Sequence, residues 1–578
     1  MAPTDQLQEV KIMLHGTAAS EGIGIGKVML IEEHSLEYTP RTVTDTEAES
    51  QRFKAAVDAF CYNTEKQAEN LRSSAGEKEA EILAGHIQII KDPYLSGEIE
   101  KLIADGQCAE SALEHMCDMF IAMFSAADDE LTKQRAADVR DIKSGVLGIL
   151  LGVNEIKVSD APKGTVLVAK ELTPSVTAGI VKENIAGIIT ETGGTTSHSA
   201  ILARALEIPA VLSVEGVASS LKNGDTVVVD GSEGAVIVNP DDNTVAEYSK
   251  KRDAFLAERK ELENYRGRET KSASGEVYEL FCNIGKPEDA VKAVDADGEG
   301  VGLFRTEFLF MDRTSIPTED EQFEAYKKAA LILKGKSLII RTLDIGGDKD
   351  IPYLGLEKEE NPFMGFRAIR YCLKNRELFK SQIKAILRAS AFGDIKIMFP
   401  LITTMDELRE GKKLVAECKA DLRNMDINFN ENIQVGVMVE TASAAVIADM
   451  LAKEADFFSI GTNDLTGYTM ACDRGNNDVS YLYSPLQPSV LRMIKRTIEC
   501  GVQNGISVGM CGEAAANKLM IPLLISFGLT EFSVSAPSVL NVRKIISTWT
   551  KEEADKVTEK VLEMSTQQEI VEYLKSVV

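Results

Sequence analysis

The stretch GGTTSHSA, residues 193–200, joins an apolar segment to a run with helical spacing and indicates an α/β fold. The apolar residues 185–189 predict a strand, and residues 199–206 predict a helix. The glycine-rich turn places His198 at the helix start, where unpaired backbone N–H groups favour an anion. Because imidazole is a nucleophile that can carry a phosphoryl group, we interpret His198 as a phosphoryl carrier. The alternative is a helix-capping loop with an incidental histidine, because glycine-rich loops are common.

Length and composition are those of a globular protein with several domains. The chain has 578 residues, 44% of them hydrophobic and 27% charged, which predicts three or four domains. It has no apolar run long enough for a transmembrane helix, and residues 1–14 lack the apolar core of a signal peptide. Nine scattered cysteines without a CxxC pair indicate reduced thiols. We therefore expect a cytoplasmic protein with no membrane association.

The net charge restricts the class of partner. A formal charge of -26 and a pI of about 4.8 argue against nucleic acid and favour a basic protein. The alternative is an ordinary acidic enzyme of the cytoplasm. Residues 51–143 contain eighteen acidic and eleven basic residues, a balance of -7, with apolar residues at helical spacing and little glycine. This segment predicts an acidic bundle of about four helices, whose charge is either a partner surface or a solvated face.

The segments on either side of the bundle predict strands. Residues 11–31 contain short apolar runs broken by glycines, and residues 166–180 predict a strand followed by a helix that starts near Thr173-Pro174. Residues 223–238 predict a β-hairpin. We expect residues 11–31 to join the later strands, which makes the bundle an insertion into one α/β domain. Residues 241–268 are rich in charge and predict a long linker helix, a candidate hinge.

The last 300 or so residues predict a (β/α)₈ barrel. Eight apolar strand-like runs alternate with helical stretches, at residues 279–284, 300–304, 337–343, 395–400, 434–439, 457–461, 507–510 and 531–535. An open doubly wound sheet is the alternative. In a barrel, chemistry lies just past the C-terminal ends of the strands. Polar residues follow these runs repeatedly, including Arg305, Thr306, Glu307, Arg341, Asp344, Arg367, Glu440, Asn463, Asp464, Arg474 and Cys511.

This set of side chains has a chemical interpretation. Arginines bind phosphate and carboxylate groups through paired hydrogen bonds. Two carboxylates with open positions for water and phosphate oxygen suit Mg²⁺. A single arginine, acid or cysteine at a strand end is usually structural, but so many together favour a site for an anion that carries both phosphate and carboxylate. Phosphoenolpyruvate (PEP) is such an anion.

The residues around His198 and the barrel motifs resemble a known family. GGTTSHSAILARALEIPAV, residues 193–211, resembles the phosphohistidine signature of PEP-utilising enzymes, and among these the Enzyme I family of the bacterial PEP:sugar phosphotransferase system. The barrel motifs are similar to that family from about residue 277 to 545. The resemblance implies a phosphotransferase that moves the phosphoryl group of PEP to His198 and then to the histidine of the carrier protein HPr, releasing pyruvate.

The resemblance also implies residue roles. Thr177 would hold one ring nitrogen of His198, and Arg204 would pair with the phosphoryl oxygens; on the sequence alone Arg204 is a surface residue. Cys511 would protonate the enolate, and Glu440 and Asp464 would hold Mg²⁺. The groups that surround PEP would be Arg305, Arg341, Arg367, Asn463 and Arg474.

The resemblance divides the chain into four parts. Residues 1–30 and 150–240 would form the phosphohistidine α/β domain, and residues 31–149 the helical insert that docks HPr. Residues 241–268 would be the linker helix. Residues 269–578 would form the PEP-binding barrel, through which two copies form a homodimer. His86, within a stretch of the insert that is similar to the family (residues 77–95), is interpreted as a packing or interface histidine.

The chain departs from the family pattern at a few positions. Thr195 stands where a basic residue is usual, which removes a positive charge beside His198. Gly467, Cys472 and residues 515–517 also differ, and we expect them to alter affinity or rate at most. Two other functions stay open: a pyruvate phosphate dikinase or PEP synthase, which would need an ATP-binding module, and a non-catalytic regulator whose phosphohistidine signals carbon status.

Overall fold

The structure, a computed structural model, describes residues 12–31, 36–74, 77–126, 130–153, 158–172, 176, 180–194, 197–311, 313–346, 351–473 and 476–578. Within these ranges it leaves out the side chains of residues 12, 70–74, 77–82, 130–134, 198, 205, 352 and 477. Thr177, Thr195, Arg474 and the predicted helix start at 173–174 therefore lie outside the described residues. The chain divides into two compact units, Met1–Arg259 and Lys260–Val578.

The first unit contains a mixed eight-stranded sheet in the order β1-β8-β7-β3-β4-β5-β6-β2. Its strands are β1 (Ile12–His15), β2 (Thr17–Ser20), β3 (Ile23–Ile31), β4 (Thr165–Ala169), β5 (Ile185–Thr190), β6 (Ala210–Leu212), β7 (Thr226–Asp230) and β8 (Ala235–Val238). β3 pairs in parallel with β4 and antiparallel with β7, so strands from before and after the helical segment share one sheet. This confirms the predicted α/β fold with an inserted bundle.

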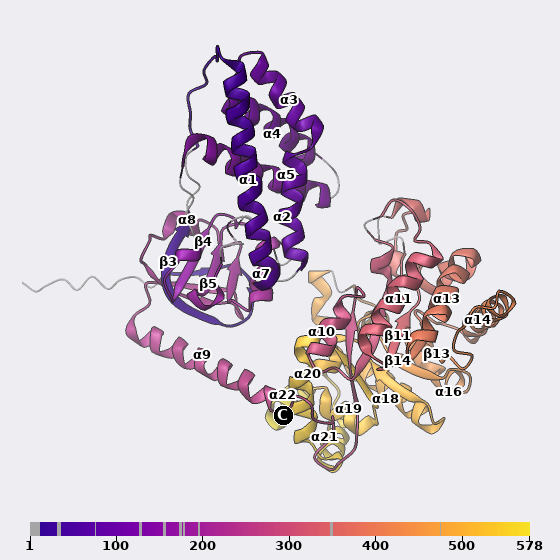
Figure 1. The fold of residues 1–578 in the computed structure, drawn as a ribbon. Helices are drawn as coiled ribbons and strands as arrows, with labels where there is room; N and C mark the ends of the chain where they lie inside the picture. Colours follow the sequence, from indigo (N-terminus) through magenta and orange to yellow (C-terminus); the bar gives the residue numbers. More distant parts are fainter. Residues whose placement is uncertain are drawn as a thin grey trace, which may run out of the picture. The chain divides into compact units, whose positions relative to one another are not determined.

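The described part of the inserted segment is mainly helical from Thr46 onward. Its helices are α1 (Thr46–Ser74), α2 (Glu77–Ile90), α3 (Pro93–Ala104), α4 (Ala109–Ser125) and α5 (Glu130–Leu151), drawn in indigo and purple in Figure 1. Their buried faces meet in a core that includes Phe53, Ile99, Leu113 and Ile142. The sequence also sets a helix start, because the side chain of Asp92 accepts hydrogen bonds from two N–H groups at the N-terminus of α3.

The predicted linker helix is present as α9 (Asp242–Glu263) and is shorter than the charged segment 241–268. The chain turns after Glu263, and Gly267 has a φ of +71°, which glycine adopts without strain. The boundary between the two compact units, after Arg259, falls inside this helix. Within the described residues, no helix combines the length and apolarity needed to cross a bilayer.

The second unit is a closed barrel of eight parallel strands. They are β9 (Glu279–Ile284), β10 (Gly300–Arg305), β11 (Leu338–Arg341), β12 (Ile395–Phe399), β13 (Val435–Val439), β14 (Phe457–Ile460), β15 (Ser507–Met510) and β16 (Glu531–Val534). Each coincides, within a few residues at its ends, with a predicted strand. The barrel prediction is therefore confirmed and the open sheet was the wrong alternative.

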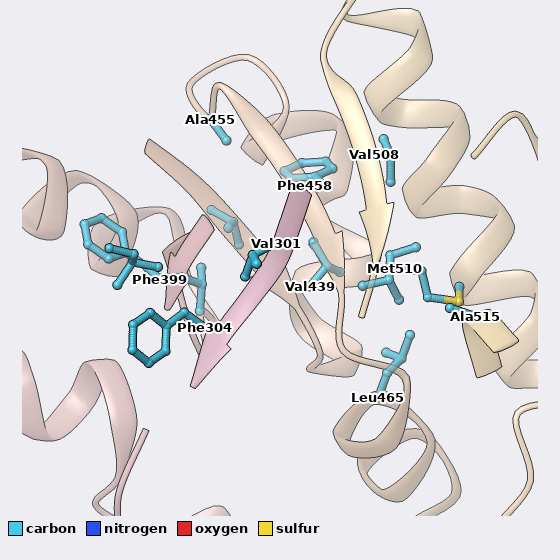
Figure 2. Packing of buried hydrophobic residues seen from close by; sticks show 14 of the residues in the cluster. Val301, Phe304, Phe399, Val439, Ala455, Phe458, Leu465, Val508, Met510 and Ala515 are labelled. Carbon is cyan, nitrogen blue, oxygen red and sulfur yellow. The ribbon is translucent and has the colours of Figure 1, made fainter. Parts of the chain in front are cut away.

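Alternation along each strand divides the barrel into an outer and an inner layer. Outward side chains such as Phe304, Phe399, Phe458 and Met510 pack against the surrounding helices (Figure 2). Inward side chains form a separate apolar cluster of Leu303, Ile339, Met398, Met438, Phe457 and Cys511. Because all eight strands run in one direction, the residues that follow them meet at one mouth of the barrel.

Candidate active site

A chain of buried ion pairs joins two of the predicted arginines at the barrel mouth. Arg341 ends β11, and Arg367 precedes helix α12 (Ala368–Lys374). Asp344 lies between them, with Oδ2 2.9 Å from Nη1 of Arg341 and Oδ1 2.8 Å from Nη2 of Arg367. Arg341 forms a second ion pair, in which its Nη2 lies 2.7 Å from Oε1 of Glu307. The two guanidiniums, each less than a tenth exposed, are thus fixed side by side.

These carboxylates keep both arginines charged. Burial disfavours a charged guanidinium, but Glu307 and Asp344 outweigh it and hold the pKa of Arg341 above its usual value. Asp344 and Asp464 do the same for the pKa of Arg367, again against the effect of burial. Nη1 of Arg367 also lies 3.3 Å from the hydroxyl of Tyr468, which in turn donates to the carbonyl of Phe363. The arginines therefore face the mouth as permanent, oriented cations.

The two predicted metal ligands follow neighbouring strands. Glu440 comes directly after β13, and Asp464 lies in the first turn of α17 (Thr462–Met470), just after β14. Oε1 of Glu440 accepts a hydrogen bond of 2.6 Å from the N–H of Leu401. Asp464 Oδ2 lies 3.3 Å from Nη2 of Arg367. Burial, with the negative charges of Asp464 and Asp344, raises the pKa of Glu440 well above its usual value.

The charge of this cluster fits a divalent cation. Four carboxylates, Glu307, Asp344, Glu440 and Asp464, face two guanidiniums, Arg341 and Arg367, which leaves a formal charge of -2 when all are ionised. Uncompensated charge in a buried site is costly, and a divalent ion would balance it. The described residues contain no group of three or more His, Cys, Asp and Glu side chains arranged for a metal. Two carboxylates completed by water and phosphate oxygens are a typical Mg²⁺ shell.

Cys511 follows β15 on the inner face of the barrel and is 7% exposed. Its thiol lies 3.8 Å from the carbonyl of Ile460, and the amide of Asn283 donates to its backbone carbonyl at 3.0 Å. Burial raises the pKa of this thiol to about 11; Ser459 and Arg341 act in the opposite direction, and Glu440 and Glu531 raise the pKa further. Cys511 is therefore a neutral acid at neutral pH, held close to the charged cluster.

The other predicted substrate ligands lie near the same strand ends. Arg305, the last residue of β10, is exposed, with its guanidinium carbon 5.1 Å from the ring centre of Phe308. Asn463 precedes Asp464 in the first turn of α17, and its carbonyl accepts a 3.0 Å hydrogen bond from Tyr483. Asp344 and Tyr468 complete this network through an ion pair and a hydrogen bond to Arg367, and no sequence signal distinguishes them from other polar residues near strand ends.

In the first unit, a strand and a helix flank the segment that carries His198, as predicted: β5 ends at Thr190 and α7 (His198–Leu206) begins at His198. The side chain of Ser197 accepts a hydrogen bond of 3.4 Å from the N–H of Ala200. Gly193 has a φ of +104°, in the left-handed region that favours glycine, and its carbonyl accepts a 2.5 Å hydrogen bond from Ser213. Arg204, one and a half turns later, donates to the carbonyl of Ala19 at 3.0 Å.

His86, interpreted as a packing or interface residue, is 1% exposed within the bundle. Its ring lies 3.4 Å from Asp138 and 3.8 Å from Asp141, both on α5. The packing interpretation therefore holds for His86.

Comparison with known proteins defines the class first. Family models of PEP-utilising enzymes match three segments: the N-terminal domain at residues 15–135, the mobile domain at residues 161–234 and the PEP-binding domain at residues 259–550. The last segment covers the whole barrel and every site residue described in it. The chain is thus a PEP-utilising enzyme by its family.

Full-length relatives define the family within that class. The phosphoenolpyruvate-protein phosphotransferase of Bacillus subtilis is 46% identical over 98% of this chain and 99% of its own length. The protein of that name from Staphylococcus carnosus is 44% identical over 97% of this chain and 98% of its own. A solution structure of Enzyme I (nEIt) covers 42% of this chain and 99% of its own, at 37% identity and a TM-score of 0.38. The chain belongs to the phosphoenolpyruvate-protein phosphotransferase family.

Proposed function

We propose that this chain transfers the phosphoryl group of PEP to His198 and then to the histidine of a carrier of the HPr type, releasing pyruvate, as the first step of sugar uptake by a phosphotransferase system. The observation that carries the proposal is the cluster at the barrel mouth, where two buried arginines, two carboxylates and a neutral thiol converge. This cluster lies within the segment that matches the PEP-binding domain.

The arginines are the groups that would bind PEP. Arg341 and Arg367 are buried and oriented, and Arg305 stands exposed at the same strand ends. We assign the phosphate and carboxylate of PEP to these three residues, with Arg474 and Asn463 completing the site. Guanidiniums suit both groups because each can donate two parallel hydrogen bonds. The carboxylates that now pair with them hold their orientation until the substrate arrives.

We propose Glu440 and Asp464 as the protein ligands of Mg²⁺, in agreement with the excess negative charge around them. When bound, the ion would withdraw electron density from the phosphoryl oxygens and neutralise charge on the transferred group.

The proposed reaction breaks the bond from phosphorus to the enol oxygen and forms a bond from phosphorus to a ring nitrogen of His198. Arg341 and Arg367 stabilise the negative charge of the transferred group by position and electrostatics. Enolpyruvate remains, and Cys511 gives its S–H proton to the methylene carbon, which produces pyruvate. Burial keeps Cys511 protonated, as this step requires. The keto form of pyruvate is more stable than the enol form, and this drives the reaction forward.

Residues around His198 would select its reactive nitrogen. We propose that Thr177 holds the other ring nitrogen, which fixes the tautomer, and that Arg204 pairs with the phosphoryl oxygens. The tight turn at Gly193 supports this arrangement, because it positions the start of α7.

We propose that the helical insert docks the HPr-type carrier. Tyr94 on α3 stacks edge-on against Phe120 on α4 with ring centres 6.3 Å apart, and Met119 and Met123 on α4 are exposed. The side chain of Asp118, beside them, is 55% exposed. Exposed apolar groups with an acidic border suit a partner that is basic around its active histidine.

The resemblance also leads us to propose the four-part division at residues 1–30 with 150–240, 31–149, 241–268 and 269–578, and a homodimer through the barrel. The loop before α12 supports an interface, since Phe363 is 40% and Met364 66% exposed. All nine cysteines are unpaired, in agreement with the cytoplasmic location that we propose.

The test is phosphorylation by labelled PEP with Mg²⁺. The native chain should acquire an acid-labile, base-stable label, and His198→Ala should acquire none. Addition of a basic histidine carrier should then remove the label from the native chain. Absence of label on the native chain would contradict the proposal, whereas stable label without pyruvate turnover would favour a regulator.

A further inference from the structure

One carboxylate lies inside the barrel, away from the charged cluster. Glu531 is the first residue of β16. Its neighbours Phe532 and Val534 belong to the outer core, so alternation directs Glu531 and Ser533 inward. Glu531 is 5% exposed, and its Oε1 has no hydrogen-bond partner within the described chain. A buried polar atom without a partner is costly and calls for an explanation.

The interior is shaped to hold this carboxyl group. A Cβ atom at Gly509 would lie 2.8 Å from Glu531 Oε1, and a Cβ at Gly302 would collide with the same oxygen. Glycines on two strands therefore leave the space that Glu531 occupies. The charged groups that face it are Glu279 on β9 and Lys396 on β12. Burial and then Glu279 raise the pKa of Glu531 to about 8, while Lys396 acts in the opposite direction.

On the inner face of the barrel, Glu531 lies two strand residues nearer the N-terminal end than Cys511. It pairs in register with Gly509, and Cys511 is two residues further along the same strand direction. Two residues of a strand span roughly 7 Å. Ser459 pairs with Gly509 from the other side, and its hydroxyl lowers the pKa of the Cys511 thiol. The Ser459 hydroxyl oxygen forms no hydrogen bond with any of the described residues.

We propose that Glu531 returns a proton to Cys511 after each turnover. The inference rests on the proposed function, in which Cys511 gives its proton to the enolate and is left as a buried thiolate. The O–H bond of the Glu531 carboxylic acid then breaks and an S–H bond forms on Cys511, directly or through the Ser459 hydroxyl, which accepts one proton and passes on its own. The negative charge moves from sulfur to the carboxylate, which regains a proton from water.

The direction of proton supply follows from the position of Glu531. The C-terminal mouth, with Arg341 and Glu440, is where substrate and product would cover Cys511. Glu531 begins its strand, towards the N-terminal end of the barrel, where its neighbour in register, Glu279, is exposed to water. A proton can thus enter from the end of the barrel opposite to the substrate. Glu531 acts through Cys511 and is not expected to contact the substrate.

The experiment measures two exchanges in one sample of the full chain with Mg²⁺, PEP and carbon-labelled pyruvate in D₂O. Movement of carbon label from pyruvate into PEP reports phosphoryl transfer and its reversal. This exchange needs no new proton, because Cys511 recovers from pyruvate the proton it gave. Entry of deuterium into the methyl group of pyruvate reports exchange of the Cys511 proton with solvent, after subtraction of the rate without protein.

Glu531→Gln should leave carbon exchange within about twofold of the native rate and reduce deuterium entry per exchange at least about tenfold, as expected for loss of an acid–base group. Glu531→Asp keeps the acid on a shorter side chain and should restore part of the deuterium entry. It provides a second test if the glutamine variant folds poorly. Glu552→Gln makes the same side-chain change on an exposed helix surface and should change neither rate.

Unchanged deuterium entry in Glu531→Gln would overturn the inference. An equal loss of both exchanges would also overturn it, because a purely structural role predicts that pattern. Absence of carbon exchange in the native chain would refute the proposed function itself, so the two failures are distinguishable.

Discussion

Asp344 connects the two buried arginines of the site, and its replacement should destabilise the barrel. Its side chain is 5% exposed and pairs with Arg341 at 2.9 Å and with Arg367 at 2.8 Å. In Asp344→Ala each guanidinium keeps one carboxylate: Glu307 at 2.7 Å for Arg341 and Asp464 at 3.3 Å for Arg367. Removal of one partner from a buried ion pair costs about 3–5 kcal/mol. Because Asp344 also repels Glu440, some energy is recovered, and we expect a loss of about 3 kcal/mol.

The single tryptophan allows this loss to be measured in the barrel alone. Trp549 is the only tryptophan of the chain and packs, half-buried, against the outer core of the barrel. Its fluorescence during urea unfolding therefore reports the second unit. With a slope of about 3 kcal/mol per molar urea, the unfolding midpoint should fall by about 1 M. Asp344→Asn keeps the shape of the side chain, so its unfolding midpoint should lie between those of Asp344→Ala and the native chain.

A surface pair of equal length provides the control. Asp449 Oδ1 lies 2.8 Å from Nη2 of Arg496, but both side chains are about half exposed. Asp449→Ala should cost less than about 1 kcal/mol, because water and salt screen an exposed pair. Equal midpoint shifts for Asp344→Ala and Asp449→Ala, or no shift for Asp344→Ala, would refute the assignment of a buried, energetically coupled network.

Three further results follow from the site. Cys511→Ser should retain labelling of His198 by PEP but lose exchange between PEP and pyruvate by about 100-fold, measured with carbon label, since proton transfer by a positioned group is worth that much; equal loss of both would contradict the assignment. Glu440→Gln should raise the Mg²⁺ concentration needed for labelling at least about tenfold in a metal titration, and an unchanged requirement would exclude Glu440 as a ligand. Burial raises the pKa of Glu531 to about 8, from about 4.3 when unfolded. The folded barrel thus binds a proton that the unfolded chain loses, so this group's contribution is full below pH about 4 and is lost as pH rises towards 8. Between pH about 4 and 8, the urea midpoint of the native barrel should fall more than that of Glu531→Gln. Equal falls of the two midpoints over this pH range would contradict the assignment.

The barrel could be predicted from sequence because its strands are buried on both faces. Such strands appear as continuous apolar runs, and a polar residue directly after a run marks the mouth. Arg341, Glu440 and Cys511 were selected in this way, and the structure places all three next to the barrel interior. Strand ends are less well defined by sequence: the apolar run spans residues 337–343, but β11 covers only Leu338–Arg341. Chain direction changes there to bring Asp344 back towards Arg341.

What the sequence could not supply was which polar residues pair across the barrel. Glu307 and Asp344 follow strands just as the selected residues do. Asp344 pairs locally with Arg341, but Glu307 pairs with Arg341 across 34 residues, and Asp344 also pairs with Arg367 across 23 residues of the chain. Glu531 was included in a predicted strand without a role, because inward and outward positions differ only by one residue in the strand register. The neighbouring glycines at 302 and 509 were the available signal, since they leave space on the inner face.

Two of the carboxylates that sequence reasoning did not select, Asp344 and Glu531, are stabilised in opposite ways, and this separates their roles. Asp344 lies between two guanidiniums, so its negative charge serves to orient Arg341 and Arg367 towards the mouth. Glu531 has only one cation, Lys396, facing it within the described barrel, and burial favours its neutral form. A charged carboxylate at the mouth can hold cations but has no proton to give, whereas a neutral one below Cys511 can give a proton and does not repel the thiolate form of Cys511. The distribution of buried charge along the barrel axis therefore supports both proposals, anion binding at the C-terminal mouth and proton supply beneath it.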